Sequence, residues 1–169
     1  AAGAAGDIDL LASWTPLLVA VDGTKIAVAP IHENFVIPAG EAITEGGDDN
    51  STPFGQALVV GAGQITASGR YRGLPAANKK ELDTLTSESG VFNQMGVYLF
   101  NEHGQIICQK DPAGTEHSPF PITGYFIGSV DSQGNNTHNF NMFQWSFASD
   151  WSNDFVIVDP VDFNPLLDL

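Results

Sequence analysis

Glycine and proline recur at short intervals along this whole chain, and their spacing is the feature that most constrains its fold. The chain has 18 glycines and 10 prolines, which separate short apolar segments instead of gathering in one linker. Short apolar segments bounded by turn chemistry are typical of β-strands, whereas helices show longer periodic patterns. The sequence therefore predicts a mainly β protein, an antiparallel β-sandwich or barrel.

Ten segments have the composition of strands. They are residues 17–21, 25–29, 35–37, 58–60, 64–72, 97–100, 105–109, 120–130, 137–148 and 155–158. At 169 residues the chain has the size of one domain with one core. We expect a flexible N-terminal arm at 1–15, a single β domain at 16–158 and a C-terminal arm at 159–169.

Turn chemistry predicts how neighbouring strands connect. Asp22-Gly23 lies between two apolar runs, which is typical of a two-residue hairpin turn. Residues 101–104 predict a second hairpin, with Gly104 available for the left-handed position. The polar stretch at 131–136 predicts a third, wider turn.

Two local features stand out within this β pattern. The apolar residues change phase between Met142 and Phe143, which indicates a β-bulge in that strand. Asn78 followed by Glu81 resembles a capping box, so we expect one short helix at about 78–89.

The charge and the cysteine content exclude several classes of protein. Twenty acidic residues against six basic ones give a net charge of −14, which disfavours binding to nucleic acid or to anionic membranes. Cys108 is the one cysteine, so no disulfide can form within the chain, and its apolar surroundings predict a buried strand thiol.

The sequence gives little sign of catalysis. The four histidines lack metal-ligand spacing, and residues 61–66 lack the third glycine of a dinucleotide loop. A cluster of acidic residues could hold Ca²⁺, but it lacks EF-hand spacing, and we interpret it as solvated surface. The cluster consists of Glu41, Glu45, Asp48 and Asp49. We therefore expect no catalytic, cofactor or metal site, and a non-enzymatic protein.

The order of elements resembles virion structural proteins of tailed bacteriophages, and most closely tail tube proteins. The resemblance consists of an N-terminal arm, a hairpin, a long loop, the helix at 78–89 and the later strands, and it is concentrated in residues 91–163. The ending Trp145-Ser146-Phe147 followed by 148–155 belongs to it. The glycine- and aspartate-rich loop at 40–55 and the proline-rich tail depart from it.

This resemblance implies a subunit that forms stacked rings around a lumen. Carboxylates lining such a lumen would repel passing DNA, which would be cargo and not a bound ligand. The implied partners are further copies of the chain and other virion proteins, with no membrane. The implied location is the virion, assembled in the cytoplasm of a bacterial host.

The two arms are the expected connectors between subunits. Their apolar anchors are Trp14, Phe163, Leu166, Leu167 and Leu169. For Trp14, closure of the chain's own core is the alternative. We expect deletion of 160–169 to leave a folded protein that no longer assembles.

A protein of another class also fits the composition. A secreted β-sandwich adhesin or carbohydrate-binding module would use exposed aromatic side chains and no catalytic residues. Trp145, Trp151 and Tyr125 would then form a platform on which a sugar stacks.

Overall fold

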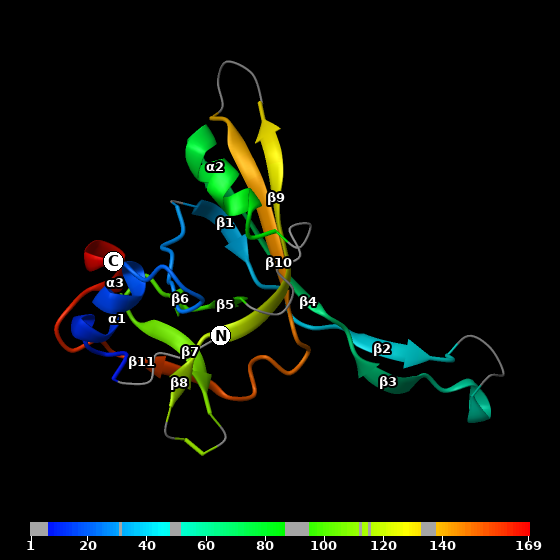
Figure 1. The fold of residues 1–169 in the computed structure, drawn as a ribbon. Coiled ribbons are helices and arrows are strands. Elements are labelled where there is room, and N and C mark those ends of the chain that lie inside the picture. The colour runs from blue at the N-terminus through cyan, green and yellow to red at the C-terminus, as the bar shows by residue number, and fades with distance from the viewer. Residues whose placement is uncertain are drawn as a thin grey trace.

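The fold is mainly β and antiparallel, as the sequence predicted, and its sheets curl into a half-barrel (Figure 1). The computed structural model describes residues 7–30, 32–47, 52–86, 95–111, 113–114, 116–132 and 138–169. The elements are α1 (Leu11–Leu18), β1 (His32–Val36), β2 (Ala42–Glu45), the 3-10 turn η1 (Pro53–Gly55), β3 (Leu58–Ala62), β4 (Ile65–Arg72), α2 (Ala76–Asp83), β5 (Met95–Val97), β6 (Leu99–Phe100), β7 (Ile106–Lys110), β8 (His117–Ser118), β9 (Phe120–Asp131), β10 (Phe140–Phe147), β11 (Phe155–Val158) and α3 (Pro165–Asp168).

The largest sheet has the strand order β1-β4-β10-β9-β5 and carries the first core on its inner face. Alternate residues of β4 and β10 are buried, as expected for strands with one covered face. Aromatic rings dominate this core: Phe143 stacks on Trp145 at 5.3 Å between centroids, and Tyr71 stacks on Phe143 at 4.2 Å.

The β-bulge lies in β9, and its prediction in the strand of Met142 and Phe143 was wrong. Burial in β10 alternates without a break, because the polar Asn141 occupies an interior position and donates from Nδ2 to the Gly128 carbonyl at 3.0 Å. The pairing of β9 with β10 instead shifts register twice, and each shift adds one residue to β9. One shift contains Gly124, whose φ of +62° suits glycine.

The smaller sheet, β11-β7-β6 with β8 also paired to β7, carries a second core. Four residues of this core are buried: Ile8, Trp14, Ile106 and Cys108. Residues of both arms, among them Ile8 and Phe163, pack in it, so the described residues form two buried clusters where one core was expected. The expected buried position of Cys108 is confirmed, and burial raises the pKa of its thiol from 9.0 to about 11.

The two strands expected at 17–21 and 25–29 are absent. Residues 11–18 form α1, because helical spacing places Trp14 and Leu17 on the same side, toward the second core. Residues 25–30 have no regular structure. The Asp22-Gly23 turn does form, with the Asp22 carboxylate accepting from Thr24, but it joins no strand pair.

Helix α2 begins two residues before the predicted start, and the capping box does not form. Pro75 occupies the N-cap position without a side-chain bond, and its φ of −61° already fits the entry to a helix. Leu82 and Leu85 pack against the first core, as their spacing indicated. The helix ends at Asp83, before the predicted end: residues 84–86 form a turn, and 87–89 lie outside the described residues. The described chain also holds helices α1 and α3, so the expectation of one helix was wrong.

The hairpin at 101–104 is confirmed between β6 and β7. The Asn101 side chain accepts from the backbone N–H of His103 and of Gln105, each at 3.0 Å. Gly104 adopts a φ of +75°. The strand expected at 97–100 is interrupted at Tyr98, where the chain passes from the larger sheet to the smaller one. Most of the turn at 131–136 lies outside the described residues.

Candidate functional site

A two-stranded ribbon, β2 with β3, projects from the larger sheet (Figure 1). Its pairing register continues that of β1 with β4. Val36 faces Ser68, and Ala42, six residues after Val36, faces Ala62, six residues before Ser68. Gly63 also donates its N–H to the Glu41 carbonyl at 2.8 Å, between the two paired regions. The ribbon is therefore the outer half of one long hairpin whose inner half belongs to the sheet.

The first strand of the ribbon lies in the segment expected to be a long loop. Residues 42–45 form β2, so the expectation of an irregular segment at 40–55 was wrong there. Glu41 directly precedes β2 and Glu45 is its last residue, and both are exposed. Asp48 and Asp49 lie outside the described residues. Within the described ranges, no three potential metal ligands come together.

The ribbon exposes apolar side chains along both strands. Ile43 is 52% exposed, Leu58 48%, Val59 70% and Val60 58%. Leu58 and Val59 are neighbours and point to opposite faces, so both faces of the ribbon are apolar and open to solvent. An isolated two-stranded hairpin is marginally stable in water, and contiguous exposed apolar surface is typical of interaction sites.

Phe54 lies near the end of the ribbon and is 97% exposed. Its φ is +61°, in the left-handed region that disfavours residues other than glycine, asparagine and aspartate. Thr52 is buried and donates from its hydroxyl to the Gln56 carbonyl, which closes the turn around Phe54. The turn thus presents the aromatic ring to solvent.

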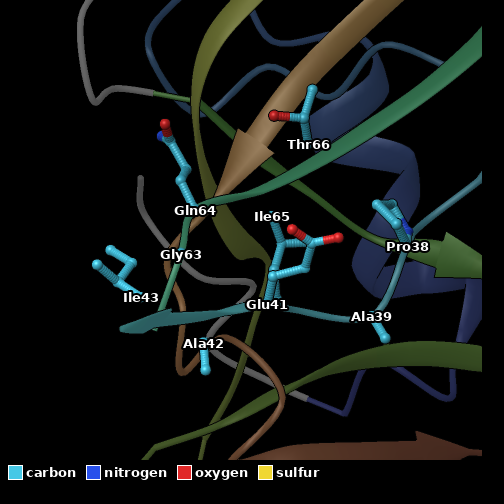
Figure 2. A pocket seen from close by; sticks show the side chains of 9 residues that line it. All are labelled: Pro38, Ala39, Glu41, Ala42, Ile43, Gly63, Gln64, Ile65 and Thr66. Atoms are coloured by element: carbon cyan, nitrogen blue, oxygen red, sulfur yellow. The ribbon is translucent and has the colours of Figure 1, made fainter. Parts of the chain in front are cut away.

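A shallow hollow of about 340 Å³ lies where the ribbon leaves the sheet (Figure 2). Its lining residues are Pro38, Ala39, Glu41, Ala42, Ile43, Gly63, Gln64, Ile65 and Thr66. None of these nine is a histidine, cysteine or serine, so the hollow offers no pairing of a nucleophile with an imidazole base. The polar side chains in the lining are those of Glu41, Gln64 and Thr66, and Glu41 is the charged one among the nine.

The outer face of the larger sheet is a second open surface. Val36 is 55% exposed, Phe126 44% and Met142 48%, although all three lie on strands within the sheet. Arg70 and Arg72 share this face, because side chains two apart on a strand point the same way. The guanidinium of Arg70 contacts Glu33 at 3.1 Å and lies 4.8 Å above the centre of the Phe140 ring.

The residues predicted to contact other subunits divide into two groups. Trp14 is 1% exposed, and Phe163 and Leu169 pack against the same core, so these three close the chain's own second core. Leu166 is 52% exposed and Leu167 is 82% exposed, and they stay predicted contacts.

Two hydrogen bonds join the two arms to each other. Val161 donates its N–H to the Asp9 carbonyl at 2.8 Å, and Leu11 donates to a carboxylate oxygen of Asp162 at 2.9 Å. The described parts of the arms, from Asp7 and from Asp159, therefore form one packed unit. Their apolar composition had indicated contact with a partner, but sequence alone did not reveal that each arm is the other's partner.

The aromatic platform expected for sugar binding is not on the surface. Trp145 is 8% exposed and Tyr125 is 7% exposed, and both belong to the first core. Trp151 is half-buried against Phe147, at 4.7 Å between ring centres. Tyr125 and Trp145 therefore stack on each other within the first core, and Trp151 stacks on Phe147.

The buried titratable groups are held in their neutral forms. Burial raises the pKa of Tyr71 and of Tyr125, whose hydroxyl oxygens are 3.5 Å apart. Together with Cys108, these groups lie in the cores and not in the hollow. None is in a position to act on a ligand there.

Comparison with protein-family models, characterised proteins and solved structures found no match to this chain. Among the helices of the described residues, none has the length and apolar character needed to cross a membrane. The candidate site is therefore identified from the exposed apolar side chains of the ribbon and of the outer sheet face. The strand at 58–60 was predicted from the sequence, but its exposure was not. An apolar strand has the same sequence pattern whether it is buried in its own core or against another molecule.

Proposed function

We propose that this chain is a non-enzymatic structural protein that assembles with itself, and that it serves as a tail tube subunit of a bacteriophage virion. The observation that supports self-assembly is the projecting ribbon, with Ile43, Val59 and Phe54 more than half exposed. Such a ribbon gains stability when a neighbour covers it. The placement in a phage tail tube derives from the sequence resemblance.

Free sheet edges add support for assembly. β1 ends the larger sheet, and β11 ends the smaller one. On β11, Phe155 is 41% exposed and Ile157 is 51% exposed. An edge strand with unpaired backbone groups and apolar side chains is a template for another chain, and closed rings remove such edges by pairing them.

The acidity of the chain fits a conduit for DNA. With a net charge of −14, a ring of several copies would surround its lumen with a negative potential. This potential would keep phosphate groups away from the wall and let DNA pass without binding. The proposed partners are further copies of the chain and other virion proteins.

The test is negative-stain electron microscopy across a concentration series, with light scattering to measure the mass in solution. We expect rings or tubes with a regular repeat and a central channel. Regular particles without a channel would support self-assembly but contradict the proposed role as a tail tube subunit. A monomer at every concentration would contradict the proposal and favour a binding module.

A further inference from the structure

Asn141 is the one buried residue of β10 with a polar side chain. It is 1% exposed and lies on the inner face of the larger sheet, among the aromatic residues of the first core. Burying an amide costs free energy unless the amide is hydrogen-bonded. The bond from Nδ2 to the Gly128 carbonyl, at 3.0 Å, offsets that cost. It joins the inner face of β10 to the neighbouring strand β9.

This bond reaches β9 at a point where the pairing register shifts. Asn141 pairs with Val130, and the next pair along the strands is Phe143 with Ile127. Between these pairs β9 has one residue more than β10, and Gly128 lies in that bulge. In a regular ladder the carbonyls lie in the plane of the sheet, whereas side chains stand on its faces. The bulge disrupts the ladder and lets the Gly128 carbonyl accept from a side chain, so the bond depends on the bulge.

The same two strands have an unbulged alternative. The register of Phe143 with Ile127 could continue to the end of both strands. Phe140 would then pair with Val130, whereas in the structure it pairs with Asp131. A slip of one residue turns every side chain beyond it to the other face of the sheet. The two registers therefore differ in which side chains of β9 face the core.

We propose that Asn141 is a positioning residue that selects the bulged register of β9. In the bulged register its amide donates to the Gly128 carbonyl. In the unbulged register that carbonyl returns to the plane of the ladder, and the buried amide loses its acceptor, which is costly. A bulge also bends its strand and increases the local twist. One side chain in the core thus contributes to the curl of the larger sheet (Figure 1).

The register also decides which side chain completes the outer face at this end of the sheet. Phe140 pairs with Arg72 on one side and with Asp131 on the other, so the three residues form one cross-strand row. The row places a positive and a negative side chain on either side of an aromatic ring. A slip would turn Asp131 to the opposite face and remove it from the row. Asn141, on the inner face, therefore determines the composition of the outer sheet face.

The test is a register-specific disulfide within the full-length chain, formed under mild oxidation. Phe140→Cys with Asp131→Cys reports the bulged register, and Phe140→Cys with Val130→Cys reports the unbulged one. A disulfide forms only where the two Cβ atoms point toward each other. The native Cys108 is buried in the second core and stays in place. With Asn141 present, peptide mapping without reductant should find the first pair linked and the second pair reduced.

Two variants remove the donor from this position. Asn141→Leu fills the site with an apolar side chain, and Asn141→Asp keeps the shape while its ionised carboxylate offers no donor. Each should raise the linkage of the second pair relative to the first about two- to tenfold, the ratio that corresponds to one hydrogen bond. Gln144→Leu is the matched control, because it removes an amide from the exposed face of the same strand. It should leave the second pair reduced.

Each other outcome overturns the inference. Linkage of the second pair in the parent chain, or to the same extent in Gln144→Leu, would mean that the register does not depend on Asn141. Folded Asn141 variants that link only the first pair would mean that other contacts fix the register. Circular dichroism reports whether the variants fold. If neither folds, Asn141 maintains the fold itself and does not select between two registers.

Discussion

The terminal arms and the ribbon are both apolar segments outside the large sheet, yet they differ in what covers them. In the arms, Trp14 is 1% exposed because Phe163 and the smaller sheet enclose it. In the ribbon, Val59 is 70% exposed and Phe54 is 97% exposed. Apolar residues thus indicate that a partner is needed, while the tertiary structure decides whether that partner is the same chain.

This difference moves the expected assembly surface. Sequence had placed the intersubunit contacts in the arms, where Leu166 and Leu167 are still available. The ribbon has more exposed apolar side chains and no cover within the described chain. Changes in the arms should therefore affect folding first, and changes in the ribbon should affect assembly first.

The strongest test of this comparison is deletion of residues 160–169. The deletion removes Phe163 and Leu169 from the second core and breaks the bond from Val161 to Asp9. We now expect a loss of about 3–5 kcal/mol in the free energy of unfolding, because two partly buried apolar side chains leave the second core together. Urea denaturation followed by circular dichroism measures it. Leu167→Ala, at 82% exposed, is the control and should change stability by about 0.5 kcal/mol or less.

A pair of aromatic substitutions compares the two regions directly. Trp14→Ala should cost about 3–5 kcal/mol, because it empties a buried site and removes the 2.7 Å bond from Nε1 to the Ile8 carbonyl. Phe54→Ala should change the stability of the monomer by about 0.5 kcal/mol or less. Chemical denaturation of dilute protein measures both. An equal loss of unfolding free energy in the two variants would show that the aromatic ring of Phe54 is covered in solution.

Two glycines test the same contrast within one hairpin. A Cβ at Gly69 would lie 2.6 Å from Cζ of Phe143, so Gly69→Ala should cost about 1–3 kcal/mol. A Cβ at Gly61 would meet nothing within 4 Å, so Gly61→Ala should be close to neutral. The shift in thermal midpoint of each variant distinguishes them. A large loss from Gly61→Ala would mean that the ribbon is packed.

Alkaline pH gives the mildest test and probes both cores. The pKa of Cys108 is raised by burial to about 11, so the unfolded thiol ionises at lower pH than the folded one. Stability should hold below pH 9 and fall as the pH rises toward 11. Tyr71 and Tyr125 add a further loss above their ordinary value of 10.0. Cys108→Ala should flatten the fall between pH 9 and 11, and Tyr125→Phe should act only at higher pH.

Much of the β pattern could be predicted, because alternation and turn chemistry are local properties. The strand predicted at 64–72 differs from β4 by one residue, and the turn before Gly104 forms as expected. The strand predicted at 17–21 was wrong, because the leucines and valines of this segment suit a helix as well as a strand. The bulge was assigned to the wrong strand, because Asn141 in an interior position hides the regular alternation of β10.

The sequence by itself determined the fold class, the acidity and the buried thiol at Cys108, since each follows from residue type and local spacing. Tertiary structure alone decided that the arms cover one another, that Trp145 lies in a core and that the ribbon is left open. The physical reason is that burial depends on contacts between residues far apart in the chain. Tyr71 and Tyr125 meet across 54 positions, and no local pattern records such a contact.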